Sequence, residues 1–129
     1  MTKSEAVTNG IRVQVRAQYV PERSEPGDGN WFFAYTIRII NERDDQVQLL
    51  SRHWIITDAH GAEEEVQGPG VVGAQPVLDP AESFEYTSFC PLKTAFGSMR
   101  GTYQMVADDG ESFDAEIAPF ALNEPYSIN

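Results

Sequence analysis

The chain of 129 residues has the length of a single domain, and it carries 20 acidic against 9 basic residues for a formal net charge of −11. Nucleic-acid affinity comes largely from lysine and arginine that neutralise phosphates, so this balance argues against general nucleic-acid binding. No run of eighteen apolar residues is present, so no membrane-spanning helix is expected. We expect one domain over residues 1–129, with a core at about 8–122 and short flexible termini.

Cys90 is the only cysteine. The chain can therefore form neither an intramolecular disulfide nor a zinc site built from several cysteines. The first residues also lack the apolar core of a signal peptide. These features predict a reducing, cytoplasmic compartment.

Alternation of apolar and polar residues dominates the first half of the chain. Residues 11–19 alternate strictly, which predicts a half-buried antiparallel strand. After a polar turn segment, residues 31–40 are aromatic and β-branched, as is typical of a central strand covered on both faces. A third strand is expected at about 46–57. Residues 63–66 are predicted to form a short, charged edge strand, because charges on an edge suppress pairing between molecules.

Further strands are predicted at 83–89, 102–107 and 112–117, with a tight turn between the last two. Short strands, frequent turns and scarce helical periodicity predict an all-β fold. The expected fold is an antiparallel immunoglobulin or fibronectin type III-like β-sandwich of about seven or eight strands. Trp54 or Trp31 is expected to fill its core. Tyr103 stands two residues before Met105, which suggests a tyrosine corner, where the hydroxyl bonds back to the backbone.

The segment 68–73 spells G-x-G-x-x-G, the pattern of dinucleotide-binding loops. Pro76 and Pro80 would break any helix that began there, so a Rossmann fold is excluded. The favoured interpretation is that Gly68, Gly70 and Gly73 supply backbone geometry at a turn between edge strands.

The alternative interpretation of the same segment is a nest of successive N–H groups that holds an anion such as pyrophosphate. Arg52, Lys93 or Arg100 would complete such a site. Pro69 removes one donor from it, and the negative net charge opposes anion binding.

Longer stretches of the sequence resemble the bacterial ApaG family from about residue 11 to 122. The matching stretches are Phe33–Thr36, Val47–Thr57, Glu65–Pro76, Tyr86–Ser88 and Gly97–Met105. The resemblance implies a fibronectin type III-like sandwich and no established enzymatic activity. Related domains in eukaryotic F-box proteins and in a DNA polymerase δ-interacting protein look like partner-binding modules. The family name is also attached to cobalt resistance and magnesium efflux.

Candidate catalytic and metal chemistry is sparse. Cys90 with His53 as its base is one nucleophile arrangement, but lone strand cysteines are usually small buried hydrophobes. Asp58, His60 and the acidic run 63–65 offer metal ligands, yet an acidic turn of this kind is usually solvated. We expect no catalytic residue, no metal ligand and no cofactor. The weak candidate ligand-binding residues are Gly68, Gly70, Gly73, Arg52 and His53.

We therefore expect a non-enzymatic binding module that recognises a protein partner, because β-sandwiches present sheet edges and loops without rearranging their cores. Two alternatives stay open. One is a nucleotide or pyrophosphate sensor that uses the glycine loop, and the other is a protein linked to cobalt or magnesium homeostasis. No nucleic acid or membrane partner is expected, and homodimer formation is left open.

Overall fold

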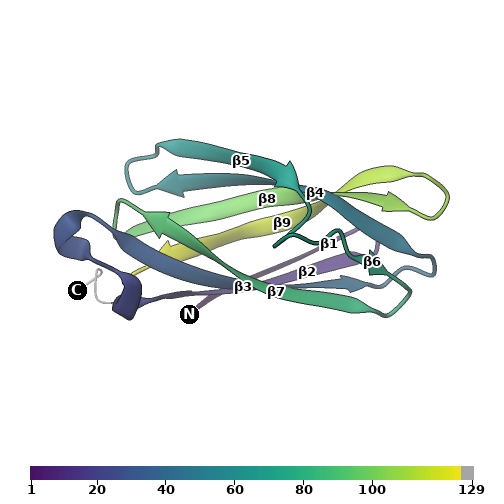
Figure 1. Cartoon of the computed structure of the whole chain (residues 1–129), viewed down its shortest axis with the longest axis horizontal. Helices are drawn as coiled ribbons and strands as arrows, with labels where there is room; N and C mark the ends of the chain where they lie inside the picture. Colours follow the sequence, from purple (N-terminus) through teal and green to yellow (C-terminus); the bar gives the residue numbers. More distant parts are fainter. Residues whose placement is uncertain (126–129) are drawn as a thin grey trace.

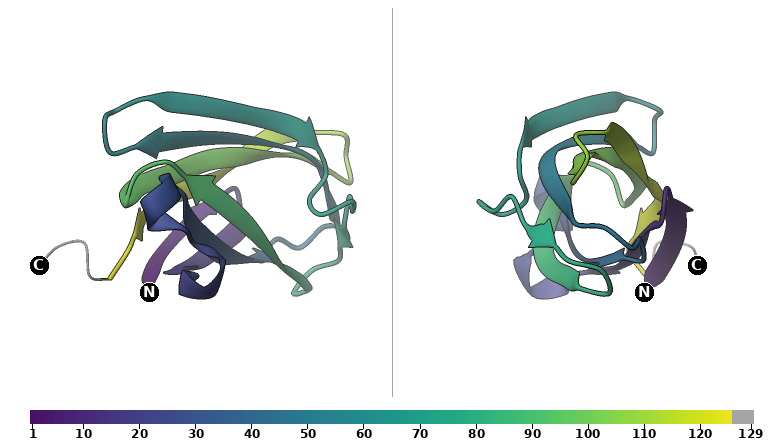
Figure 2. Two further views of the ribbon diagram at one scale, coloured as in Figure 1. Left: turned by 60° about the vertical axis from the view of Figure 1, so that its left-hand side comes forward. Right: turned by 90° about the vertical axis from the view of Figure 1, so that its right-hand side faces the viewer.

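The structure is a computed structural model that describes residues 1–125. Two antiparallel sheets pack face to face, with strand orders β1-β2-β3-β7 and β5-β4-β8-β9, and β6 also pairs with β4 (Figures 1 and 2). The strands are β1 (Thr2–Thr8), β2 (Ile11–Tyr19), β3 (Trp31–Asn41), β4 (Val47–Asp58), β5 (Glu63–Pro69), β6 (Val77–Leu78), β7 (Ser83–Leu92), β8 (Phe96–Ala107) and β9 (Ser112–Asn123). Two 3-10 turns, η1 (Pro21–Arg23) and η2 (Pro26–Asp28), join β2 to β3.

The predicted β-sandwich is confirmed, and its strands follow the alternation of the sequence. β2 has the predicted bounds. Its odd-numbered residues from Ile11 to Ala17 are buried and Tyr19 is half-buried, while the even-numbered residues face solvent. β7, β8 and β9 are longer than expected. β1, which no periodicity indicated, forms a hairpin with β2 through Asn9 and Gly10. Both turn residues have positive φ, 48° and 77°, as a type I′ turn requires. No helix among the described residues is long and apolar enough to span a membrane.

Trp54 fills the core between the sheets, as expected from the sequence. Its side chain is 3% exposed. The indole ring lies edge-on to Tyr35 of β3, with centroids 5.4 Å apart, and to Phe120 of β9 at 6.0 Å. One residue of β4 therefore contacts strands of both sheets. Trp31 is half-buried instead, and its Nε1 donates a hydrogen bond to the Glu124 carboxylate at 2.8 Å.

The outer face of β3 is not covered by another layer, contrary to the prediction. Phe32 lies on this face and stacks on Phe89 of β7, with ring centroids 5.4 Å apart. The Arg23 guanidinium lies over the Phe32 ring at 4.2 Å. A local cation–π cluster thus accounts for Phe32, one of the apolar residues that suggested burial on both faces.

The tyrosine-corner prediction for Tyr103 is wrong. Tyr103 lies within β8, fully buried, and its hydroxyl is 2.5 Å from the hydroxyl of Tyr86 on β7. The bond therefore joins side chains of opposite sheets and does not return to the backbone. Burial raises the pKa of both phenols, so both stay neutral, and one hydroxyl donates to the other.

The sandwich is closed on one side by β1 and β9. The Ser4 hydroxyl donates to the Ala118 carbonyl at 2.9 Å, and the Thr2 hydroxyl donates to the Ala121 carbonyl. The Glu116 N–H donates to the Thr8 hydroxyl at 3.1 Å. On the other side, β5 and β7 are the edge strands of their sheets, and no described strand pairs with either edge. We call this the open side.

The paired hydroxyls make a testable contribution to stability. Tyr103→Phe should lower the free energy of unfolding by about 1–3 kcal/mol, because it leaves the Tyr86 hydroxyl buried without its partner. The double variant Tyr86→Phe/Tyr103→Phe should lose less than the sum of the two single variants. Urea unfolding curves measure all three. Additive losses would mean that the two hydroxyls do not interact.

Candidate functional site

A groove runs along the open side between β5 and β7. Its wide part has a volume of about 620 Å³ and extends from η2 to the start of β5. Its narrow part, about 310 Å³, continues toward the glycine loop. The two parts share Ile56, Glu64 and Pro91 in their linings, so they form one continuous depression, which we call the open-side groove.

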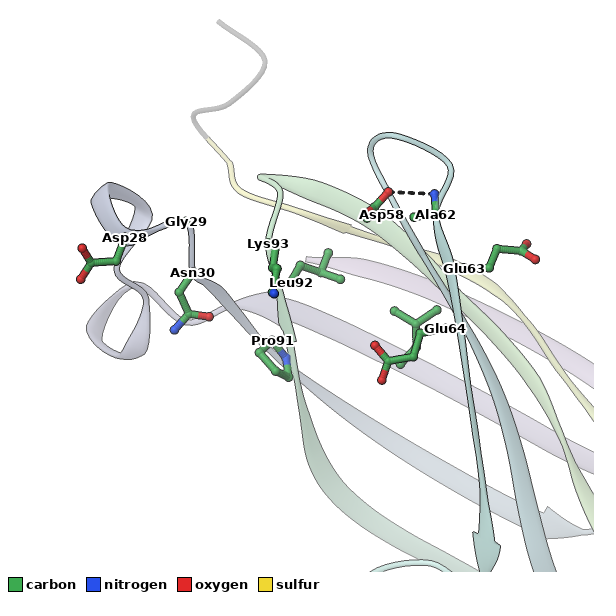
Figure 3. Close-up of a pocket in the computed structure, with 11 residues that line it drawn as sticks. Asp28, Gly29, Asn30, Asp58, Ala62, Glu63, Glu64, Pro91, Leu92 and Lys93 are labelled. Carbon is green, nitrogen blue, oxygen red and sulfur yellow. Dashed lines mark hydrogen bonds between the residues drawn. The ribbon is translucent and has the colours of Figure 1, made fainter.

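The floor of the groove is apolar, and its rim is mostly acidic. Its floor is formed by side chains of both sheets: Tyr35, Trp54, Ile56, Val66, Cys90, Leu92 and Met99. In the wide part, Glu64 lies on one wall, and Pro91, Leu92 and Lys93 lie on the facing wall, whereas the Glu63 side chain points away from them (Figure 3). Asp28 and Asp58 add two carboxylates to the lining there, against the single cation of Lys93.

The edge of β7 offers backbone groups to the open side. The Phe32 carbonyl accepts a hydrogen bond from the Val20 N–H on the β2 side. Because bonding alternates along an antiparallel strand, even-numbered residues of β3 bond toward β2 and odd-numbered ones toward β7. The register pairs odd residues of β3 with even residues of β7. The backbone N–H and C=O groups that point outward are therefore those of Ser83, Glu85, Thr87 and Phe89.

The edge of β5 follows the same rule. The Asp58 N–H donates to the Ala62 carbonyl, so even-numbered residues of β5 bond to β4. The outward backbone groups are those of Glu63, Glu65 and Gln67.

Each free edge also carries one proline, Pro91 on β7 and Pro69 on β5, at a position whose nitrogen points outward. A proline there removes a donor without breaking the sheet. The two edges are thus open over a limited length only.

Glu64 points into the groove. It stands opposite Ile56 in the β4–β5 register, and residues opposite each other share a face of the sheet. Its neighbours Glu63 and Glu65 point to the outer face, where they pair with Arg100 at 3.4 Å and with His53 at 2.7 Å. Glu64 itself makes no hydrogen bond or ion pair with any residue in the described part of the chain. This carboxylate lies above an apolar floor.

The glycine loop ends in a tight turn. Val71 and Ala74 exchange two backbone hydrogen bonds of 2.8 Å each. Val72 and Gly73 between them have φ of 43° and 82°, which is the geometry of a type I′ turn. Gly70 also has positive φ, 60°, and a Cβ there would lie 2.2 Å from the Ala74 carbonyl oxygen. The chain can make this turn only with glycine at position 70.

Of the three basic residues considered for the glycine loop, Arg52 is the one for which the described residues show a bond to it. Its guanidinium donates to the carbonyls of Pro69 and Gly70, at 2.9 and 3.0 Å. It also lies against Gly68, where an added Cβ would be 3.1 Å from a guanidinium nitrogen. The Gly70 N–H donates to the Leu50 carbonyl, so this donor too is bonded within the protein. The anion-binding hypothesis stays a prediction. The Arg52 guanidinium and the Gly70 N–H are already bonded to carbonyls of the protein.

His53 lies on the outer face of β4, away from the loop and the groove. Its Nε2 is 2.7 Å from the Glu65 carboxylate and 3.4 Å from the Gln67 amide. Neighbouring residues of a strand point to opposite faces, so His53 and Arg52 cannot share a site. The candidate ligand-binding set is therefore split between two surfaces.

Cys90 lines the groove but is buried, at 3% exposure. Burial, with a smaller contribution from the negative charge of Glu64, raises the pKa of the thiol to about 12. A neutral buried thiol is a poor nucleophile, and His53 faces the opposite side of its sheet. Within residues 1–125, no three His, Cys, Asp or Glu side chains gather in a way that could hold a metal ion.

The ApaG domain family matches residues 21–107. The chain belongs to the ApaG family. Protein ApaG of Anaeromyxobacter dehalogenans strain 2CP-C is 61% identical over 126 residues, covering 98% of this chain and 99% of that protein. Protein ApaG of Methylobacterium radiotolerans is 55% identical over 121 residues, with 94% and 93% covered.

Solved structures share the fold of this chain. The crystal structure of the putative ApaA protein from Bordetella pertussis has a TM-score of 0.88 at 48% identity, covering 97% of this chain and 98% of that one. The C-terminal domain of wzt has a TM-score of 0.56 at 10% identity, covering 94% and 77%, and this likeness shows the fold alone.

Sequence reasoning missed the open-side groove as a site. The acidic run 63–65 was interpreted as an edge, which is correct, but only the register with β4 shows that Glu64 faces inward. The alternation of the strand carried part of this signal: Val66 had to face the core, and Glu64 is two residues away.

The turn geometry predicts that two glycine substitutions in the glycine loop lower the free energy of unfolding by unequal amounts. Gly73→Ala should cost about 1–2 kcal/mol, because only its positive φ is strained and the added methyl meets open space. Gly70→Ala should cost more, because its methyl also collides with the Ala74 carbonyl. Thermal melting of both variants measures the difference. Equal melting temperatures would show that the close approach at Gly70 relaxes freely.

The burial of Cys90 predicts slow thiol chemistry in the folded protein. At pH 8, a pKa of about 12 leaves about one thiol in ten thousand ionised. Reaction with Ellman's reagent should be at least about a hundredfold slower in the native protein than in denaturant. A native rate close to the denatured one would mean that the thiol is exposed and ionises normally.

Proposed function

We propose that the protein is a non-enzymatic binding module that holds a protein partner in the open-side groove. The observation that carries this proposal is the pair of free sheet edges, β5 and β7, on either side of a preformed apolar floor. Backbone groups repeat along both edges at the spacing of a strand. A polypeptide can pair with such a series of donors and acceptors, whereas a small molecule would satisfy only a few of them.

The chemistry of the groove supports binding over catalysis. The titratable groups of its floor, Tyr35 and Cys90, have pKa values raised by burial and are neutral near pH 7. Catalytic groups usually have pKa values close to the working pH, so that they can exchange protons or act as nucleophiles. The groove thus offers apolar contact and hydrogen bonds without an activated group.

Charge reversal at Glu64 tests the proposed function. Glu64→Arg places the opposite charge over the floor of the groove, whereas the matched variant Glu116→Arg makes the same change on an exposed residue of β9. Each variant and the wild-type protein would be immobilised and incubated with native lysate. The retained proteins would then be identified by mass spectrometry. We expect wild type and Glu116→Arg to retain the same partner and Glu64→Arg to lose it.

Two outcomes contradict this proposal. Capture of the same proteins by all three would place binding outside the groove. Specific capture by none would argue against a stable protein partner. Circular dichroism of each variant confirms that the sandwich is folded.

A further inference from the structure

We propose that the partner binds as an extended strand added to the free edge of β7, with one lysine or arginine side chain directed into the groove at Glu64. This inference rests on the proposed function and specifies the chemistry of the partner. It commits to one edge, one conformation and one charged contact.

The edge of β7 is the longer of the two. Outward backbone groups occur at Ser83, Glu85, Thr87 and Phe89, in an unbroken series that ends at Pro91. The β5 edge has three such residues before Pro69. A strand of about seven residues can therefore pair with β7 and make main-chain hydrogen bonds with each of these residues in turn.

A strand added to β7 directs alternate side chains inward. Residues of the added strand that lie beside Ser88 and Cys90 share their inner face and face the opposite wall of the groove. The opposite wall is formed by Ile56, Glu64 and Val66, and Arg52 lies beside them with its guanidinium bonded to the carbonyls of Pro69 and Gly70. Apolar side chains match Ile56 and Val66, whereas a basic side chain matches Glu64.

Glu64 selects the charge of that side chain. An apolar residue placed over it would strip water from a carboxylate that has no ion-pair partner among residues 1–125, at a cost in free energy. A lysine or arginine replaces that water with a charge-assisted hydrogen bond. Glu64 thus penalises apolar strands and favours a basic one.

The charge of the whole protein acts in the same direction. A second copy of this chain also carries a net charge of −11 and would bring Glu85 to a β7–β7 contact. Electrostatic repulsion opposes such self-pairing, and a basic segment is attracted. The structure therefore favours a basic extended segment of a different protein as the occupant.

Selection from a phage-displayed library of random peptides of about twelve residues tests the inference. Peptides retained by the wild-type protein should alternate apolar and polar residues and carry one lysine or arginine among the apolar positions. Fluorescence polarisation then measures the affinity of one selected peptide. Glu64→Lys should weaken it at least tenfold, and a peptide with glutamate in place of its basic residue should recover affinity for Glu64→Lys.

Three further variants identify the edge. Thr87→Pro removes an outward N–H from β7, whereas Thr87→Ala keeps that N–H and loses the same side-chain contact with Thr36. Gln67→Pro removes an outward N–H from β5. We expect at least a tenfold loss of affinity for Thr87→Pro and less than a twofold change for the other two, with melting curves confirming the fold of each.

The possible failures are distinct. A loss with Gln67→Pro in place of Thr87→Pro would move the strand to β5 and overturn the edge assignment. Selected peptides without a basic residue, unaffected by Glu64→Lys, would overturn the charge assignment while leaving the groove as a binding site. Retention of no peptide would overturn strand addition itself, whereas the lysate capture with Glu64→Arg judges the proposed function independently.

Discussion

The packing of Trp54 between the two sheets is the contact on which the architecture depends. The indole ring touches Tyr35 and Phe120, so β4 is tied to strands on both sides of the core. Beside it, the hydroxyls of Tyr86 and Tyr103 form a polar bridge between the sheets within the same aromatic layer. These contacts set the separation of the sheets near the open side, and they keep the floor of the groove in place while its edges stay unpaired.

The two sides of the sandwich differ in how the edges of their sheets are bonded. Side-chain hydroxyls of β1 bond to backbone carbonyls of β9, which satisfies groups that would otherwise face solvent at two more sheet edges. On the other side, β5 and β7 keep outward backbone groups with no described strand beside them. The glycine loop and Arg52 end the groove at one extremity, because the guanidinium is bonded to the loop carbonyls.

Strands that follow local alternation could be predicted from the sequence. Contacts between strands that are distant in the sequence could not. The fold class and β2 followed from periodicity, whereas β1 has few apolar residues and is held by its pairing with β2 and by its hydroxyl bonds to β9. The Tyr86–Tyr103 pair requires knowledge of which strands face each other. Arg52 and His53 are both weak candidates from sequence, and the alternation of a strand already places neighbouring residues on opposite faces.

The hydrogen bonds between β1 and β9 affect the order in which the chain folds. The bond from Thr2 to Ala121 spans 119 positions of the chain, so it forms only after residue 121 has left the ribosome. The β1–β2 hairpin, with its Asn9–Gly10 turn, can form at once from local contacts. Its bonds to β9 form only after β9 has been synthesised. Contacts of such long separation close slowly. During synthesis the nascent sandwich is therefore open on both sides. Once β9 is in place, only the side between β5 and β7 stays open.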